Sequence, residues 1–211
     1  MPSSSQLDPD PWNVSLVDTD LFTVVPSLGA IVPGWLLVVP KGHTICAGAM
    51  AQDHRSELEV VVHNAAEAMR AEFGRVIIFE HGPSQTGQQL GCSIDHTHIH
   101  LVPSLLDIKQ AIFELYDGNI VWSKVPNMGA TADAYSKGIP YLYLEQDESC
   151  YMATGASLRS QTLRRIIALY AGAIEFDWKI DAQMDNVYST INRLKGLTFF
   201  NPVHCSMQTI S

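Results

Sequence analysis

The chain has 211 residues, of which 46% are hydrophobic and 17% are charged, a composition typical of a globular protein with enough apolar material for a core. Its formal net charge of −9 argues against binding of polymeric nucleic acid, which needs Lys and Arg to neutralise phosphates. No segment reaches the ~18 consecutive apolar residues of a membrane helix. The four cysteines form no C-x-x-C pair, which predicts a reducing, cytoplasmic setting.

The first part of the chain predicts short strands. Residues 1–11 are rich in Ser, Pro and Asp and are expected to be a disordered lead-in. Residues 12–17 and 21–25 are expected to be two strands joined by a turn. The continuous apolar run 35–39 is typical of a buried strand and is ended by Pro40.

A long helix and a second pair of strands are expected next. Apolar residues at helical spacing predict the main helix over 52–73, and a glycine follows its end. Residues 75–79 are expected to form a strand, residues 80–93 a glycine-containing loop, and residues 94–102 another strand. The pattern therefore predicts an antiparallel meander crossed by one helix.

Residues 104–211 are expected to form an extension that packs on the preceding part. Helices are predicted at 107–116, 160–170 and 185–194, and strands at 120–125 and 141–144. Arg164 and Arg165 fall in one of these helices. Although either could reach a substrate phosphate, we expect both to lie on a solvated helix face.

Three histidines occupy alternate positions in the predicted strand at 94–102. Because side chains alternate faces along a strand, His96, His98 and His100 would share one face at a spacing of roughly 6.5–7 Å. Three imidazoles at that spacing can surround one small anion or one metal ion. A neutral imidazole is also a good nucleophile toward phosphorus, and its unperturbed pKa is ~6.5. Phosphoryl chemistry and a zinc site are therefore both open at this point.

The histidine row and two flanking segments resemble the histidine triad (HIT) superfamily. His96-x-His98-x-His100 followed by an apolar pair is similar to its signature. The run that ends in Pro40-Lys41-Gly42-His43 resembles the strand that ends in Pro-Lys-x-His, and Gly91-Cys92-Ser93-Ile94 resembles Gly-Gln-Ser-Val. The three pieces occur in the family's order, and the resemblance covers residues 12–103.

The resemblance implies an α+β fold with a HIT-like antiparallel five-stranded sheet and flanking helices, to which residues 104–211 add a C-terminal α/β extension. It implies a nucleotide hydrolase or nucleotidyl transferase that acts at the α-phosphate of a nucleotide or nucleotide conjugate. The expected assembly is a homodimer paired through the main helix. This chemistry requires no metal or cofactor, and neither a membrane nor polymeric nucleic acid is an expected partner.

The resemblance also implies roles for individual residues. His98 would be the nucleophile and would carry a covalent nucleotidyl-histidine intermediate. His96 and His43 would form a supporting proton network, His100 would hold a phosphate oxygen, and Ser93 would assist the leaving group.

Substrate-binding residues are expected on both sides of the triad. Val25, Ser27 and Leu28 would lie near the nucleoside, and Glu80, Gly91 and Cys92 would complete the pocket. Several of these positions depart from the family pattern. Ser27 stands where an acidic residue usually holds the ribose, Glu80 or His81 stands in place of an asparagine, and Cys92 replaces a glutamine.

Two alternatives to an enzyme of this kind follow from the same residues. The departures would suit a catalytically weak nucleotide-binding or sensor protein. A zinc-dependent hydrolase that uses His96, His98 and His100 as ligands is the other alternative.

Overall fold

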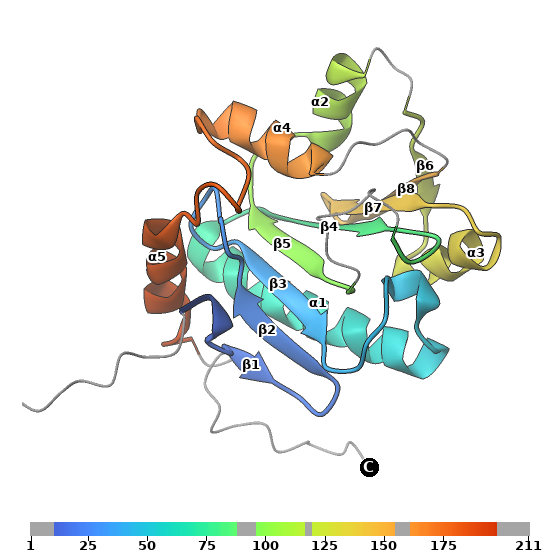
Figure 1. The fold of residues 1–211 in the computed structure, drawn as a ribbon, viewed down its shortest axis with the longest axis horizontal. Helices are drawn as coiled ribbons and strands as arrows, with labels where there is room; N and C mark the ends of the chain where they lie inside the picture. The colour runs from blue at the N-terminus through green and yellow to red at the C-terminus, as the bar shows by residue number, and fades with distance from the viewer. Residues whose placement is uncertain (1–10, 88–95, 117–119, 155–160, 198–211) are drawn as a thin grey trace, which may run out of the picture.

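Eight strands form one sheet in the computed structural model, which describes residues 11–87, 96–116, 120–154 and 161–197 (Figure 1). The order across the sheet is β1-β2-β3-β5-β4-β7-β8-β6, and neighbouring strands are antiparallel. The strands are β1 (Val17–Asp18), β2 (Phe22–Pro26), β3 (Leu36–Pro40), β4 (Val76–Gly82), β5 (Ile99–Pro103), β6 (Ser123–Val125), β7 (Tyr141–Gln146) and β8 (Ser149–Thr154).

Five α-helices and three short 3-10 helices surround the sheet. They are α1 (Gln52–Phe73), α2 (Ile108–Leu115), α3 (Thr131–Ser136), α4 (Thr162–Ala171) and α5 (Met184–Leu194), with η1 (Pro11–Asn13), η2 (Ala47–Ala49) and η3 (Met128–Ala130). Among the described residues, none of these helices has both the length and the apolar character to cross a membrane.

The two faces of the sheet are covered by different helices. The long helix α1 packs on one face, where Leu58 and Met69 join a cluster with Ile78 and Leu101 from the strands. On the other face α2 and α4 cover strands β4, β5 and β7 (Figure 1). Strand β4 is buried at nearly every position because helices lie on both of its faces.

The predicted α+β class is confirmed, and the sheet is wider than expected. Strands β1 to β5 are the five that the family resemblance implied. The C-terminal part of the chain then adds β7, β8 and β6 beyond β4, so that β4 is an inner strand. Strand β8 and helix α3 were not predicted from the sequence.

Element boundaries agree best for the helix. The bounds of α1 coincide with the predicted 52–73, and Gly74 follows its last residue as predicted. Residues 12–17, predicted as a strand, instead form η1 and only the start of β1. Strand β5 begins at Ile99, so His96 and His98 lie in extended chain just before it rather than within it.

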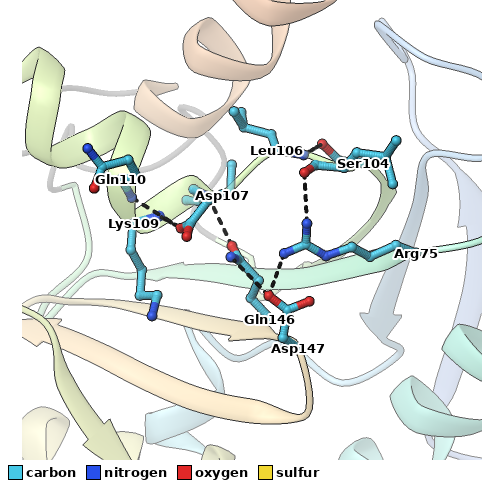
Figure 2. A network of polar contacts seen from close by, with 10 residues as sticks. Arg75, Ser104, Leu106, Asp107, Lys109, Gln110, Gln146 and Asp147 are labelled. Carbon is cyan, nitrogen blue, oxygen red and sulfur yellow. Dashed lines mark hydrogen bonds and ion pairs between the residues drawn. The ribbon is translucent and has the colours of Figure 1, made fainter.

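A polar network ties the C-terminal part to the ends of β4 and β5 (Figure 2). Arg75 donates to the Leu105 carbonyl at 2.7 Å and to the Asp147 carboxylate at 2.6 Å. The Asp107 carboxylate caps the first turn of α2, and the Gln146 side-chain oxygen accepts from the Ile108 amide at 3.0 Å. These contacts fix where α2 starts and how it meets the loop between β7 and β8.

We expect residues 11–103 not to fold without the remainder of the chain. Removing residues 104–211 would expose Trp35, Ile77, Phe79 and Val102, which are buried together with side chains of α2, α4 and β7. At roughly 1.5–3 kcal/mol each, these four side chains account for about 6–12 kcal/mol, as much as the whole stability of a typical domain. Circular dichroism and proton NMR of the fragment, beside the full chain, test this. A cooperative unfolding transition and dispersed methyl signals in the fragment would contradict it.

Candidate active site

A cavity of about 300 Å³ lies over strands β2 and β3 and the start of β5. Its polar lining comes from Ser27, His96, Thr97, His98, His100 and Arg164. The apolar part of the wall includes Val25, Leu28, Leu37, Val39, Trp12 and Trp178. This volume is at the lower end of small-molecule sites and suits a ligand of nucleoside size.

The register of the sheet explains why these residues share one face. Val25 pairs with Leu37, Leu37 pairs with His100, and His100 pairs with Phe79 on the next strand. Paired residues in adjacent strands point to the same side. This row of paired residues therefore begins at the apolar wall of the cavity and passes through His100. It ends at Phe79, which packs beneath α4.

The His98 ring is held by a hydrogen bond to the backbone two residues earlier in the chain. Its Nδ1 lies 2.7 Å from the carbonyl oxygen of His96. Because a carbonyl can only accept, Nδ1 must carry the hydrogen, and in the neutral ring Nε2 then has the free lone pair. This is the form of an imidazole that can attack an electrophile.

The His100 ring has the opposite arrangement. The indole Nε1 of Trp35 donates to His100 Nδ1 at 3.0 Å, so in the neutral ring the hydrogen is on Nε2. The ring is stacked on Phe79, with centroids 4.5 Å apart and an interplanar angle of 14°. The His98 ring meets it edge-on at 4.9 Å. The two neighbouring histidines therefore present a lone pair and an N–H donor respectively.

His96 lies at the end of the row nearest to β3. Its Nε2 is 2.8 Å from the Pro40 carbonyl oxygen, and its ring is 5.4 Å from that of His43. His43 itself is exposed and does not line the cavity. The hydroxyl of Thr97 bonds that of Thr44 at 2.8 Å, which fixes the chain between His96 and His98.

Burial keeps the two inner imidazoles uncharged. Desolvation lowers the pKa of His98, and the nearby Arg164 lowers it further, against the hydrogen bond to His96 and the carboxyl of Glu80. Desolvation lowers the pKa of His100 well below its usual value, and His98, Arg164 and His81 act in the same direction. Both rings are therefore neutral at pH 7.

The prediction that Arg164 lies on a solvated helix face is wrong. Its side chain is only 4% exposed and lines the cavity, while Arg165 is exposed as expected. Arg164 donates to the Gly29 carbonyl and to the Ser27 hydroxyl, and its guanidinium lies 4.7 Å from the Trp35 ring centre. Helix α4 therefore holds the loop that follows β2.

Position 29 in that loop requires a glycine because Trp178 packs closely against it. Its φ is +70°, and a Cβ there would be 2.4 Å from the Cβ of Trp178. The Gly29 amide donates to the Ala182 carbonyl at 2.8 Å. The segment before α5 thus packs directly on the loop and brings Trp178 to the wall of the cavity.

Glu80 does not take the predicted place beside the substrate. Its carboxylate is buried on the α1 side of the sheet, where it accepts from the Tyr141 hydroxyl at 2.6 Å and from the Ala47 amide at 2.7 Å. Burial raises the pKa of Glu80, and burial together with Glu80 raises the pKa of the nearby Cys46 thiol to about 12. Glu80 therefore joins β4 to β7 and to η2, the short helix before α1.

The remaining predicted residues divide into two groups. Val25, Ser27 and Leu28 line the same cavity as the triad. Gly91, Cys92 and Ser93 lie outside the described residues. Within the described part of the chain, no three His, Cys, Asp or Glu side chains are grouped to hold a metal ion, which leaves the zinc alternative without support.

Trp35, Trp12 and Trp178 were not singled out from the sequence. The alternation of Trp35 with Leu37 in a strand that precedes Pro40 could have placed it on the triad's face. Trp12 and Trp178 carry no such signal, because each reaches the cavity from outside the sheet.

Comparison with known proteins agrees with this geometry. Residues 13–105 match the HIT domain family model. This stretch therefore matches the family that the histidine motifs resemble, and it contains His96, His98 and His100. No curated protein matches the chain.

Solved structures with HIT-like folds are distant from it. A hypothetical histidine triad nucleotide-binding protein from Sulfolobus tokodaii has 21% identity and a TM-score of 0.37, over 43% of this chain and 59% of that protein. A Hit-like protein involved in cell-cycle regulation from Bartonella henselae has 16% identity and a TM-score of 0.39, over 59% and 85%. A uridylyltransferase has 12% identity and a TM-score of 0.40, over 92% and 94%. Likenesses of this size carry no functional argument.

We expect Trp35→Phe to disturb the tautomer of His100. The change leaves His100 Nδ1 buried without its donor, at a cost of about 1–3 kcal/mol in the free energy of unfolding. Nitrogen-15 NMR of the histidine rings should report hydrogen on Nε2 of His100 in the native chain and a tautomer mixture in the variant. Trp122→Phe is the matched control, because the Trp122 indole nitrogen is buried and has no hydrogen-bond partner among the described residues. Equal spectra for the native chain and Trp35→Phe would contradict the assignment.

Proposed function

We propose that this chain is a HIT-type nucleotide hydrolase or nucleotidyl transferase that reacts at the α-phosphate through a covalent nucleotidyl-histidine on His98. The observation that carries the proposal is the His98 ring, which is neutral, bonded through Nδ1 to a carbonyl and directed by that bond to react through Nε2. It stands in a cavity of nucleoside size within a HIT domain. HIT-domain proteins act on nucleotides as hydrolases or transferases.

The division of the cavity supports a nucleotide as substrate. Trp12, Trp178, Val25 and Leu28 offer apolar and aromatic surface for a base and sugar. The triad at the other end offers a nucleophile and, on His100, an N–H donor for a phosphoryl oxygen. Such a donor is most effective when negative charge develops on that oxygen in the transition state.

The remaining triad roles are proposed from the same contacts. His96, bonded to Pro40 and beside His43, would relay protons, with the exposed His43 linking it to solvent. Ser93 would assist the leaving group. Water as the acceptor would make the enzyme a hydrolase, and a second alcohol or phosphate would make it a transferase.

A binding or sensor protein is the second candidate. It is favoured by Ser27, which replaces the family's ribose carboxylate and is bonded to Arg164 rather than open to a sugar diol. Such a protein would retain nucleotide in the cavity without forming an adduct.

The predicted homodimer and cytoplasmic location stay predictions. The outward face of α1 is mostly polar, and Val60 is the one large apolar side chain of α1 that is well exposed, at 58%. Interfaces are usually depleted of such charged and polar surface at their centre. If this chain pairs, we therefore propose that it does so through a surface other than α1.

We expect intact-protein mass spectrometry to detect the intermediate. The protein is mixed with nucleoside phosphoramidates, dinucleoside polyphosphates and nucleotide sugars, and is quenched at mildly alkaline pH, where a phosphorus–nitrogen bond to histidine survives. A mass increase of one nucleotidyl group should appear with the native chain and with His54→Ala, whose side chain is exposed on α1. It should be absent with His98→Ala.

The outcomes separate the candidates. An adduct that persists in His98→Ala would remove His98 as the nucleophile. Bound nucleotide without an adduct or product would favour the binding protein over the enzyme.

We expect the adduct to form even at pH values below 6.5, the ordinary pKa of a histidine side chain. Only the neutral ring attacks, so the rate should rise with pH and level off, with a midpoint below 6.5 because the pKa of His98 is lowered. A nucleoside p-nitrophenyl phosphate is used, since its leaving group needs no proton. Arg164→Met should move the midpoint to higher pH, because the lost positive charge no longer opposes protonation. Arg165→Met, on the exposed side of α4, should leave it in place. A midpoint at or above 6.5 in the native chain would contradict the assignment.

A further inference from the structure

We propose that His81 binds a non-bridging oxygen of the reacting phosphate, on the side of His98 away from the nucleoside. The inference rests on the proposed function and assigns a phosphate contact to His81, for which the sequence predicted no role. Its substrate class is a phosphate ester or amide with a free anionic oxygen beside the reacting phosphorus.

The sheet register puts His81 on the face of the sheet that carries His100. Phe79 of β4 pairs with His100 of β5, and the strands are antiparallel. Two residues further along β4, His81 is close enough to His100 to lower the pKa of that ring. Because side chains alternate along β4, His81 lies on the same face as Phe79, with ring centroids 6.3 Å apart, and Glu80 lies on the opposite face.

The His81 ring lacks hydrogen-bond partners within the part of the chain that the structure describes. Both of its nitrogens are buried, and neither has a partner among those residues. By contrast, each triad ring has one nitrogen bonded within the protein: His96 to Pro40, His98 to a backbone carbonyl and His100 to Trp35.

An unpartnered buried ring needs a physical reason. Each buried polar atom left without a hydrogen bond costs about 1–3 kcal/mol, so native proteins retain few of them. A ring that keeps both nitrogens unpaired close to His100 is explained if the partner arrives with the ligand. An anionic oxygen is the partner that suits it, because at least one imidazole nitrogen always carries a hydrogen.

The position also fits the geometry of the reaction. The apolar wall of the cavity lies over β2 and β3, on one side of His98. Strand β4 lies on the other side of β5. A phosphorus atom in front of His98 Nε2 would have non-bridging oxygens directed to both sides. His100 and His81 could then each donate to one of them, and no covalent bond to His81 is needed.

Ligand binding tests the proposal without turnover. The affinities of nucleoside monophosphates and of the matching nucleosides are measured by calorimetry for the native chain, His81→Phe and His81→Asn. We expect His81→Phe to weaken monophosphate binding about tenfold, which is equivalent to ~1.4 kcal/mol. Nucleoside binding should be unchanged. His81→Asn keeps an N–H donor and should recover part of the loss. His54→Phe is the control, because His54 is exposed on α1.

Melting temperature separates binding from a structural role. Replacing an unpartnered buried ring by an apolar one of similar size removes a penalty, so His81→Phe should melt at the same temperature as the native chain or higher. A variant that melts lower and loses affinity for nucleoside and monophosphate alike would overturn the proposal. Unchanged monophosphate affinity in His81→Phe would overturn it as well.

Sulfur substitution then tests the same contact in the reaction. The two diastereomers of a nucleoside phosphorothioate aryl ester place sulfur at one or the other non-bridging position. In the native chain, sulfur facing His81 should slow adduct formation, and in His81→Phe that penalty should disappear for this diastereomer alone. Equal penalties in both proteins would contradict the contact.

Failure of the two proposals would look different. A native chain that binds monophosphate through His81 but forms no adduct would refute the enzyme and keep this inference. An adduct on His98 that is indifferent to His81 would do the reverse.

Discussion

The hydrogen bond from the Trp35 indole to His100 connects the candidate active site to the rest of the fold. Trp35 is fully buried, its ring meets Phe79 edge-on at 6.1 Å, and the Arg164 guanidinium covers it. An imidazole in such surroundings is neutral, and a neutral imidazole has one donor and one acceptor. By supplying the donor, Trp35 determines which nitrogen of His100 faces a ligand. The tautomer of a reacting side chain is thus set by a residue of the buried core.

The extension completes the site as well as the core. Residues within the match to the HIT family model contribute the three histidines and the apolar wall over β2 and β3, whereas Arg164 and Trp178 come from residues beyond it. Arg164 also holds the loop after β2 through its bonds to Ser27 and Gly29. The extension therefore forms part of the cavity, in addition to widening the sheet.

Much of the fold and part of the site could be predicted from local patterns. Helix α1 follows from periodicity. The antiparallel five-stranded sheet and the placement of Val25, Ser27 and Leu28 near the histidines follow from the family resemblance. Arg164 could not be predicted, because a basic residue on an amphipathic helix is usually solvated, and only tertiary packing buries it here. Glu80 was assigned to a loop beside the substrate. Strand β4 instead continues through it, and the alternation of side chains turns it to the α1 side.

The reactivity of His98 depends on groups from both faces of the sheet. Glu80 favours the charged imidazolium, while burial and Arg164 oppose it. Burial also raises the pKa of Glu80, which makes its carboxylate less available to stabilise a positive ring. The balance therefore favours the neutral His98 ring. The charged group that opposes its protonation is Arg164, a side chain of α4. Arg164, which lies outside the match to the HIT family model and carries no motif to mark it, thus helps to keep His98 neutral.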